Sequence, residues 1–191
     1  MVVGGERAGP GPLTAGAGVF VAADVHYPAS GGARAAAVVA ADAAFCTLLA
    51  DRTAHVAGVP PYRPGEFYLR ELPPLQAVLD GLDGIELLVV DGYADLDPAG
   101  RPGLGARAHD RFGVPVIGVA KTAFRTATHA VPVIRGERSA RPLYVTAAGM
   151  PRQHAAELVR RMAGRHRLPD ALRRADALAR GHGRADNGAN A

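Results

Sequence analysis

Two short, uninterrupted apolar runs constrain the fold of this chain more than any other feature. Residues 85–92, IELLVVDG, end in an aspartate and a glycine, and residues 114–121, VPVIGVAK, end in a lysine. An apolar run of this length is typical of a strand buried on both faces, in the middle of a sheet that helices cover on either side. We therefore expect an α/β domain built around these two strands.

The segments around the two runs supply the other elements. The turn PASGG favours a hairpin between the first two strands, and Gly136 marks the turn of a second hairpin. Pro73 and Pro74 are expected to interrupt or begin the first helix. The expected elements are strands over 18–27, 33–45, 46–58, 85–92 and 114–121, a hairpin over 129–146, and helices over 68–82, 104–113, 151–164 and 169–180. This order predicts a mixed central sheet with helices on its faces, in one domain over residues 17–180.

Composition limits the class of protein. The Gly/Ala-rich residues 1–16 and 181–191 are expected to be disordered. The sequence has neither an apolar run long enough for a membrane helix nor a secretory signal, so we expect a cytoplasmic protein. Cys46 is the only cysteine, which excludes an intramolecular disulfide and a cysteine-rich zinc site. The formal charge of +4 favours a polyanionic partner only weakly, because the basic residues 160–180 could simply form a solvated helix.

Charged residues follow or interrupt the predicted strands. Binding sites in α/β sheets lie beyond the carboxyl ends of the strands, where Asp24, Asp91 and Lys121 fall. A carboxylate in an apolar strand is costly unless it is paired or binds a metal. Together with Glu71, the two aspartates could bind a hard divalent cation, and the lysine could offset charge on a phosphate. Singly, each carboxylate could instead cap a helix, close a turn or form an ion pair, and the lysine could extend to solvent.

The stretch VPPYRPGEFYLRELP, residues 59–73, holds an aromatic ring between prolines just before Glu71. Prolines restrict their own backbone and that of the preceding residue. Pro61 and Pro64 would therefore present the Tyr62 ring with little freedom. The ring could equally pack its own turn against the domain.

Five segments, in this order and at these spacings, resemble the deoxyinosine-directed endonuclease V family: AADVHY, PYRPGEFYLRELP, LLVVDG, GVAK and RPLYVT. The resemblance implies an RNase H-like fold. It also implies cleavage of a phosphodiester near a deaminated base in DNA or RNA, with Mg²⁺ or Mn²⁺, as a step of nucleic-acid repair. A monomer with no membrane partner is expected.

By position, the resemblance assigns a role to each charged candidate. Asp24 and Asp91 match the metal-binding aspartates of the family. Glu71 matches its catalytic glutamate, and Lys121 matches its active-site lysine.

The resemblance also assigns residues to the nucleic acid. Pro61, Tyr62 and Pro64 match a wedge that separates strands, and Arg63 between them could add a phosphate contact. Gly92 falls where the family builds the pocket for a flipped hypoxanthine, a base whose weak pairing lowers the cost of leaving the stack.

The chain departs from the family pattern in several positions. Tyr93 and Ala94 replace a His-Gly pair, and Asp97 replaces a later histidine. His26 replaces a serine, and Met150 replaces a histidine that contributes to the metal site in the family. These departures concern both the metal site and the base pocket.

Two histidines could compensate for the histidine missing at Met150. His26 is two residues after Asp24, so both side chains leave the same face of a strand. His154 follows Met150 by one helical turn. More ordinary roles are a polar residue at a strand end and a residue on a helix surface.

Three functions therefore compete: an active inosine endonuclease, a catalytically impaired homologue that binds nucleic acid, and a nuclease of the same fold with altered base preference. The chain keeps two aspartates, a glutamate and a lysine that are costly to hold together unused. This retention favours the active enzyme.

Overall fold

The computed structural model describes residues 18–58, 60, 68–137 and 139–182. Of the segments expected to be disordered, residues 1–16 and residues 183–191 of the tail 181–191 lie outside the described residues. The candidate residues Pro61, Tyr62, Arg63 and Pro64 lie outside them as well. In the described ranges, no helix is long and apolar enough to cross a membrane.

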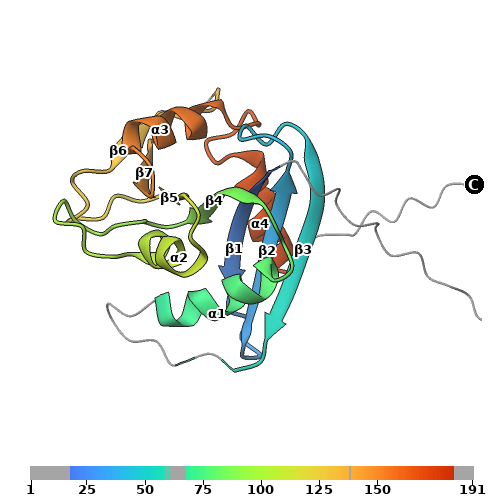
Figure 1. Ribbon diagram of the computed structural model, residues 1–191. Coiled ribbons are helices and arrows are strands. Elements are labelled where there is room, and N and C mark those ends of the chain that lie inside the picture. Colours follow the sequence, from blue (N-terminus) through green and yellow to red (C-terminus); the bar gives the residue numbers. More distant parts are fainter. Residues whose placement is uncertain (1–17, 59, 61–67, 138, 183–191) are drawn as a thin grey trace, which may run out of the picture.

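Seven strands form one mixed sheet in the order β3-β2-β1-β4-β5-β7-β6 (Figure 1). The first three strands form an antiparallel meander, β4 and β5 run parallel to β1, and β7 and β6 complete the sheet in antiparallel pairings. The strands are β1 (Val19–His26), β2 (Ala33–Ala40), β3 (Leu48–Val56), β4 (Ile85–Asp91), β5 (Val116–Ala120), β6 (Val131–Val133) and β7 (Leu143–Ala148). The helices are α1 (Tyr68–Leu79), α2 (Leu104–Phe112), α3 (Arg152–Arg161) and α4 (Asp170–Ala179). The expected α/β class, a mixed sheet flanked by helices, is confirmed.

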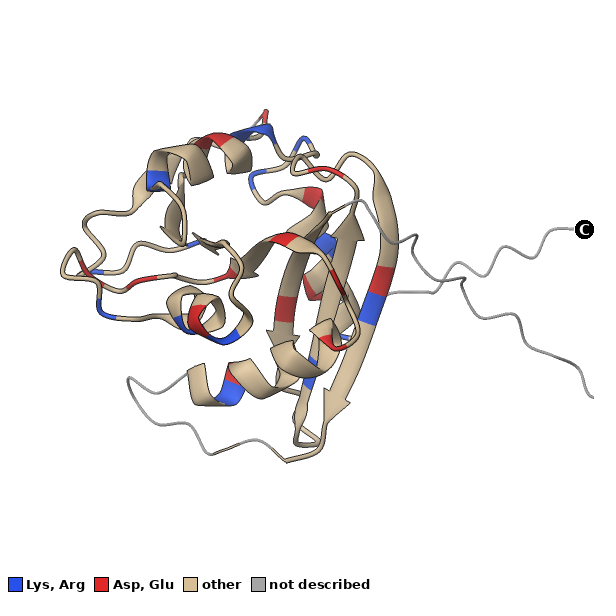
Figure 2. Ribbon diagram, viewed as in Figure 1, with Lys and Arg blue, Asp and Glu red and all other residues tan. Residues whose placement is uncertain are grey.

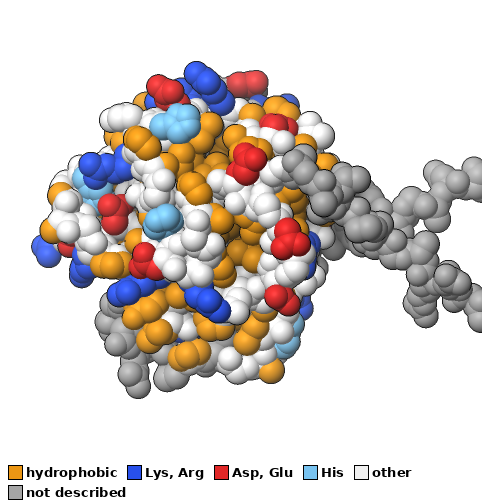
Figure 3. Space-filling model, in the orientation of Figure 1, with side chains coloured by type: hydrophobic (Ala, Val, Ile, Leu, Met, Phe, Trp, Pro, Cys, Tyr) orange, Lys and Arg blue, Asp and Glu red, His pale blue; other side chains and the backbone are white. Residues whose placement is uncertain are grey.

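The helices cover both faces of the sheet, and each face has its own apolar core (Figure 1). α1 and α2 bury Leu75, Val78 and Leu104 on one face, whereas α3 and α4 bury Val159 and Leu172 on the other. β4 and β5 contribute side chains to both cores, which explains their continuous apolar sequences. In the space-filling view, hydrophobic side chains are visible mainly around a hollow at the centre of the face shown, between polar side chains (Figure 3).

The second strand is shorter than the sequence indicated. It was expected to continue to Phe45, but it ends at Ala40. The Asp42 carboxylate accepts hydrogen bonds from the backbone N–H groups of Ala44, Cys46 and Thr47, at 3.0, 3.1 and 2.8 Å. This side chain closes a turn before β3, and such local bonds compete with a strand.

The first helix passes through Pro73 and Pro74 without a break. Each proline removes a backbone donor from the helix, which favours an interruption. Pro74 and Leu75, however, are buried, and their burial offsets the lost hydrogen bonds. The unbroken helix carries Glu71 in its first turn, so its course determines where this carboxylate lies.

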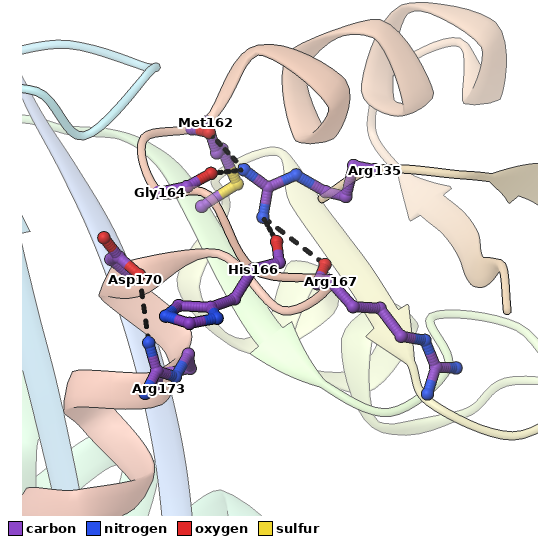
Figure 4. Close-up of polar contacts among 7 residues, drawn as sticks. All are labelled: Arg135, Met162, Gly164, His166, Arg167, Asp170 and Arg173. Carbon is purple, nitrogen blue, oxygen red and sulfur yellow. Dashed lines mark hydrogen bonds and ion pairs between the residues drawn. The ribbon is translucent and has the colours of Figure 1, made fainter. Parts of the chain in front are cut away.

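Arg135 is buried between the β6–β7 turn and the connection from α3 to α4 (Figure 4). Its Nη1 donates hydrogen bonds to the carbonyls of His166 and Arg167, at 3.0 and 3.4 Å. Its Nη2 donates to the carbonyls of Met162 and Gly164, at 2.5 and 3.0 Å. The last carbonyls of a helix lack partners within it, so this guanidinium supplies donors where α3 ends.

We expect Arg135→Met to lower the free energy of unfolding by about 3 kcal/mol, because four carbonyls lose a charged donor at once. Denaturation in urea would measure the loss. Arg173→Met is the matched control, since Arg173 is half-exposed and, among the described residues, its guanidinium forms an ion pair with Asp170 alone, at 3.4 Å. This control should change stability by about 0.5 kcal/mol or less. Equal losses in the two variants would contradict the role given to Arg135.

Candidate active site

Three parallel strands bring Asp24, Asp91 and Lys121 to one edge of the sheet. β1 and β4 are in register with Ala23 beside Val90, so the two aspartates follow one another across neighbouring strands. Asp91 ends β4, and Lys121 directly follows β5. The carboxyl ends of parallel strands thus meet at the position where α/β sheets place their sites.

The same three side chains also share one face of the sheet. Side chains two residues apart on a strand leave the same face. The residues two positions earlier, Ala22, Val89 and Val119, all belong to the core beneath α3 and α4. Both aspartates and the lysine therefore point to the α4 side of the sheet.

Lys121 and Asp91 form an ion pair, with Nζ 2.5 Å from Oδ2. Although burial lowers the pKa of Lys121, its hydrogen bond to Asp91 and the charges of Asp91, Asp24 and Asp176 together raise it above the ordinary value. The ammonium is therefore fully protonated at neutral pH. It offers a fixed positive charge at the mouth of the site.

Asp24 and Glu71 are carboxyl groups that resist ionisation in this arrangement. Burial, followed by the charge of Asp91, raises the pKa of Asp24 to about 7. Burial and then the charges of Asp24 and Asp91 raise the pKa of Glu71 to about 8. Such shifts arise where acidic groups face one another away from water, and they are common at functional sites.

Glu71 reaches this edge from α1, which packs on the opposite face of the sheet from α4. The preceding residue, Arg70, places its guanidinium carbon 4.3 Å from the centre of the Tyr27 ring, just after β1. This cation–π contact holds the start of α1 against the end of β1. The charge of Arg70 also lowers the pKa of Glu71, but by less than burial raises it.

A fourth carboxylate, Asp176 of α4, was missed by the sequence reasoning. Its charge raises the pKa values of both Asp24 and Lys121, which places it within electrostatic range of the site. It also binds Arg180 one turn later, at 2.9 Å. The sequence carried a signal: Asp176 follows the buried Leu172 by four residues, so it interrupts the apolar stripe of an amphipathic helix.

The carboxylates together offer only oxygen ligands, which hard divalent cations prefer. As the side chains stand, no three His, Cys, Asp or Glu residues in the described ranges are close enough to hold an ion. Asp91 and Asp176 instead contact Lys121 and Arg180. By their chemistry the carboxylate oxygens fit a divalent cation, whose charge would relieve the repulsion between them.

A cavity of about 570 Å³ opens beside the carboxylates. The Tyr93 hydroxyl joins two of its loops: it accepts a hydrogen bond from the Phe124 N–H at 2.9 Å and donates one to the Thr122 carbonyl at 2.7 Å. The two aromatic rings lie 5.9 Å apart, tilted by 47°. Residues lining the cavity include Tyr68, Glu71, Asp91, Gly92, Tyr93 and Phe124. Aromatic walls of this kind suit a flat ring such as a nucleobase.

The two candidate substitute histidines are placed differently. His26 ends β1 on the side of Asp24, whereas His154 lies in the first turn of α3. β7 runs antiparallel to β5, with Ala148 beside Val116, so α3 starts at the sheet edge opposite Lys121. Within the described ranges, neither imidazole makes a hydrogen bond or an ion pair with another residue.

The same topology places Met150 at that opposite edge, close to the start of α3. Two acidic residues of the loop that follows Gly92 have partners of their own. Asp95 lies 3.0 Å from the ring of His129, and Asp97 lies 3.4 Å from Arg101. The structure brings none of these three side chains to the carboxylate group.

The sheet order and its acidic edge first define a class, the RNase H-like α/β domains. A crystal structure of Endonuclease V from Streptomyces avermitilis matches with a TM-score of 0.73 at 29% identity, over 87% of this chain and 81% of that chain. Endonuclease V from Ciona intestinalis, solved in complex with a 24mer DNA containing an inosine followed by a ribo-adenosine, has the same fold. It matches with a TM-score of 0.73 at 18% identity, over 86% and 85% of the two chains.

Sequence comparison then identifies the family. The Endonuclease V family model matches residues 13–139. Endonuclease V of Streptomyces avermitilis is 31% identical over 90% of this chain and 82% of its own length. That of Rhodospirillum centenum is 34% identical over 92% and 80%. The chain belongs to the endonuclease V family and is an endonuclease.

Proposed function

We propose that this protein is a metal-dependent endonuclease that hydrolyses a phosphodiester near inosine or deoxyinosine in RNA or DNA, as a step of nucleic-acid repair in the cytoplasm. The observation that supports this most is the aromatic-lined cavity whose wall includes Glu71 and Asp91. A base held in that cavity would bring its own backbone to the carboxylates. The family membership supports inosine as the base.

In this proposal Asp24 and Asp91 would hold Mg²⁺ or Mn²⁺, and Glu71 and Asp176 could add oxygen donors. The ion supplies a polarised phosphate and a water of lowered pKa. The two aspartates would hold the ion from the ends of β1 and β4, which the parallel pairing of these strands keeps side by side. Glu71, in the first turn of α1, is buried, so bulk water is kept from this side of the site.

Lys121 would offset negative charge on the phosphate, and Glu71 would take up a proton. The Lys121 ammonium, freed from Asp91, can donate a hydrogen bond to a non-bridging phosphate oxygen and offset the negative charge that develops there. A carboxyl group with a pKa near the working pH can both take and return a proton. In its ionised form, Glu71 can therefore accept a proton from the attacking water at a carboxylate oxygen.

A cleavage assay tests this proposal directly. Single strands and duplexes of DNA and RNA, each with one inosine or a matched adenosine, would be incubated with the protein and Mg²⁺ or Mn²⁺. We expect a metal-dependent cut at one position near inosine and none in the adenosine controls. Inosine strands left intact with both metals would overturn the proposed function.

A second candidate is a nuclease of the same fold with altered base preference. The hydrogen bond from the Phe124 N–H to the Tyr93 hydroxyl, in the wall of the cavity, favours it. Cleavage of strands that contain uracil or an abasic site, compared with inosine strands, separates it from the first. Faster cleavage of either alternative lesion would select the second candidate.

Tyr93→Phe tests whether the hydrogen bonds of the Tyr93 hydroxyl are needed for binding of the base. The change keeps the ring but removes both hydrogen bonds of the hydroxyl, so Phe124 loses its anchor. We expect inosine-strand binding to weaken about tenfold, corresponding to roughly 1.4 kcal/mol, with less preference over adenosine strands. Tyr144→Phe on β7 is the control, and anisotropy titrations would compare the two. Identical titrations for both variants would exclude a role for the Tyr93 hydroxyl.

A further inference from the structure

The connection from α3 to α4 has its carbonyl groups turned inward. Arg135 donates hydrogen bonds to the carbonyls of Gly164, His166 and Arg167 (Figure 4). In a planar trans peptide, the N–H of the next residue points opposite to the carbonyl. The described residues contain no cis peptide. The backbone donors of residues 165, 167 and 168 therefore point away from Arg135.

The β6–β7 turn lies directly against this connection, and the two enclose a cavity of about 330 Å³. Gly136 permits the close approach. Its φ is +88°, and a Cβ on it would lie 2.7 Å from the Arg167 backbone nitrogen. The residues lining the cavity are Gly136, Glu137, Ser139, Arg165, His166 and Arg167.

The cavity is rich in positive charge. Two arginines, Arg165 and Arg167, line it, and Arg165 is exposed. Glu137 is the one acidic residue in the lining. Figure 2 shows basic residues at the top of the view, where the α3–α4 connection meets the β6–β7 turn, with acidic residues among them. Cations and backbone donors without a flat apolar wall suit a phosphate better than a base.

The cavity also adjoins the candidate active site. The Arg167 guanidinium donates hydrogen bonds to the carbonyl of Lys121 and, at 2.7 Å, to that of Pro142. Arg167 thus lines the cavity with its backbone and braces the end of β5 with its side chain. A strand whose reacting phosphate lies at Lys121 would pass over this surface.

We propose that the cavity between the β6–β7 turn and the α3–α4 connection is a phosphate-binding site for the backbone of the nucleic-acid substrate, on the Lys121 side of the cleavage point. The proposal rests on the proposed function, since it assigns the path of the same substrate. Arg165 contacts the phosphate, the outward N–H groups add donors, and Arg135 holds the loop in shape.

Binding measured as a function of salt tests the site separately from cleavage. Anisotropy of a fluorescent inosine strand would be titrated with Ca²⁺ in place of Mg²⁺, at several KCl concentrations. We expect Arg165→Gln to reduce the slope of log K against log salt by about one. The variant should bind inosine strands and adenosine strands more weakly by the same factor, about fivefold at low salt. Glu137→Gln should strengthen the binding of both strands.

Arg152→Gln is the matched control. It removes the same charge from an exposed position at the start of α3, at the opposite edge of the sheet. If Arg165→Gln and Arg152→Gln give the same slope while inosine strands still bind, the phosphate site is wrong and the proposed function stands. If the unaltered protein binds no inosine strand, both proposals fail.

A series of strands, each with a neutral methylphosphonate at a different linkage, would locate the contacted phosphate. At one linkage, the methylphosphonate should weaken binding by the unaltered protein about as much as Arg165→Gln weakens binding of the unmodified strand. The same methylphosphonate should weaken binding by the Arg165→Gln variant little further. Additive losses at every linkage would overturn the proposal.

Discussion

Asp91→Asn is expected to reduce metal-dependent cleavage by roughly 10³-fold or more, equivalent to about 4 kcal/mol of activation free energy. Asparagine keeps the shape of the side chain but removes the charge that would fix the cation at the end of β4. It also leaves Lys121 without the carboxylate that lies 2.5 Å away. Asp24→Asn should act in the same direction, because the two aspartates stand side by side on β1 and β4.

Single-turnover cleavage of an inosine strand would measure both variants. Asp170→Asn is the control, since Asp170 begins α4 and contacts Arg173 on the surface, at 3.4 Å. Binding of the uncut strand should change by less than about threefold in all variants, which assigns the loss to chemistry. Cleavage by Asp91→Asn within tenfold of the unaltered rate would remove this residue from the metal site.

The elements whose position is set by local pattern were predictable from the sequence. The apolar runs of β4 and β5 indicated buried parallel strands, and the charged residues at their ends, Asp91 and Lys121, indicated where a site would form. These inferences need only the neighbouring residues in the chain. The passage of α1 through Pro73 and Pro74 was not predictable in this way, because burial against the sheet outweighs the local preference.

Contacts between distant segments could not be predicted. The tie of Tyr93 to Phe124 and the cage around Arg135 depend on loops that only the complete sheet brings together. The direction of β7 determines on which edge of the sheet position 150 lies. Because β7 runs antiparallel to β5, its end leads away from Lys121, and position 150 lies at the far edge. Asp176 enters the site from α4 instead, and its position on an apolar stripe was the signal that could have found it.

Glu71→Gln should change activity and stability in opposite directions. The pKa of Glu71 is about 8 in the folded protein, compared with 4.5 for an unperturbed glutamate. The folded state therefore binds more protons than the unfolded state between these values. Its contribution to stability is present below about pH 4.5 and is lost as the pH rises through 8. Glutamine carries no charge at any pH, so the variant escapes this loss.

We therefore expect Glu71→Gln to raise the free energy of unfolding at pH 9, in EDTA, on the order of 2–4 kcal/mol, and to leave it nearly unchanged at pH 4.5. Cleavage should fall by roughly 10²-fold or more, because the proton acceptor is gone. Glu157→Gln, on the exposed side of α3, should alter neither property. Denaturation at the two pH values and single-turnover cleavage would measure the two effects. A variant that is less stable at pH 9 would show that Glu71 is a structural carboxylate. A gain in stability together with loss of cleavage would mark it as a group held in an unfavourable charge state for the sake of the reaction.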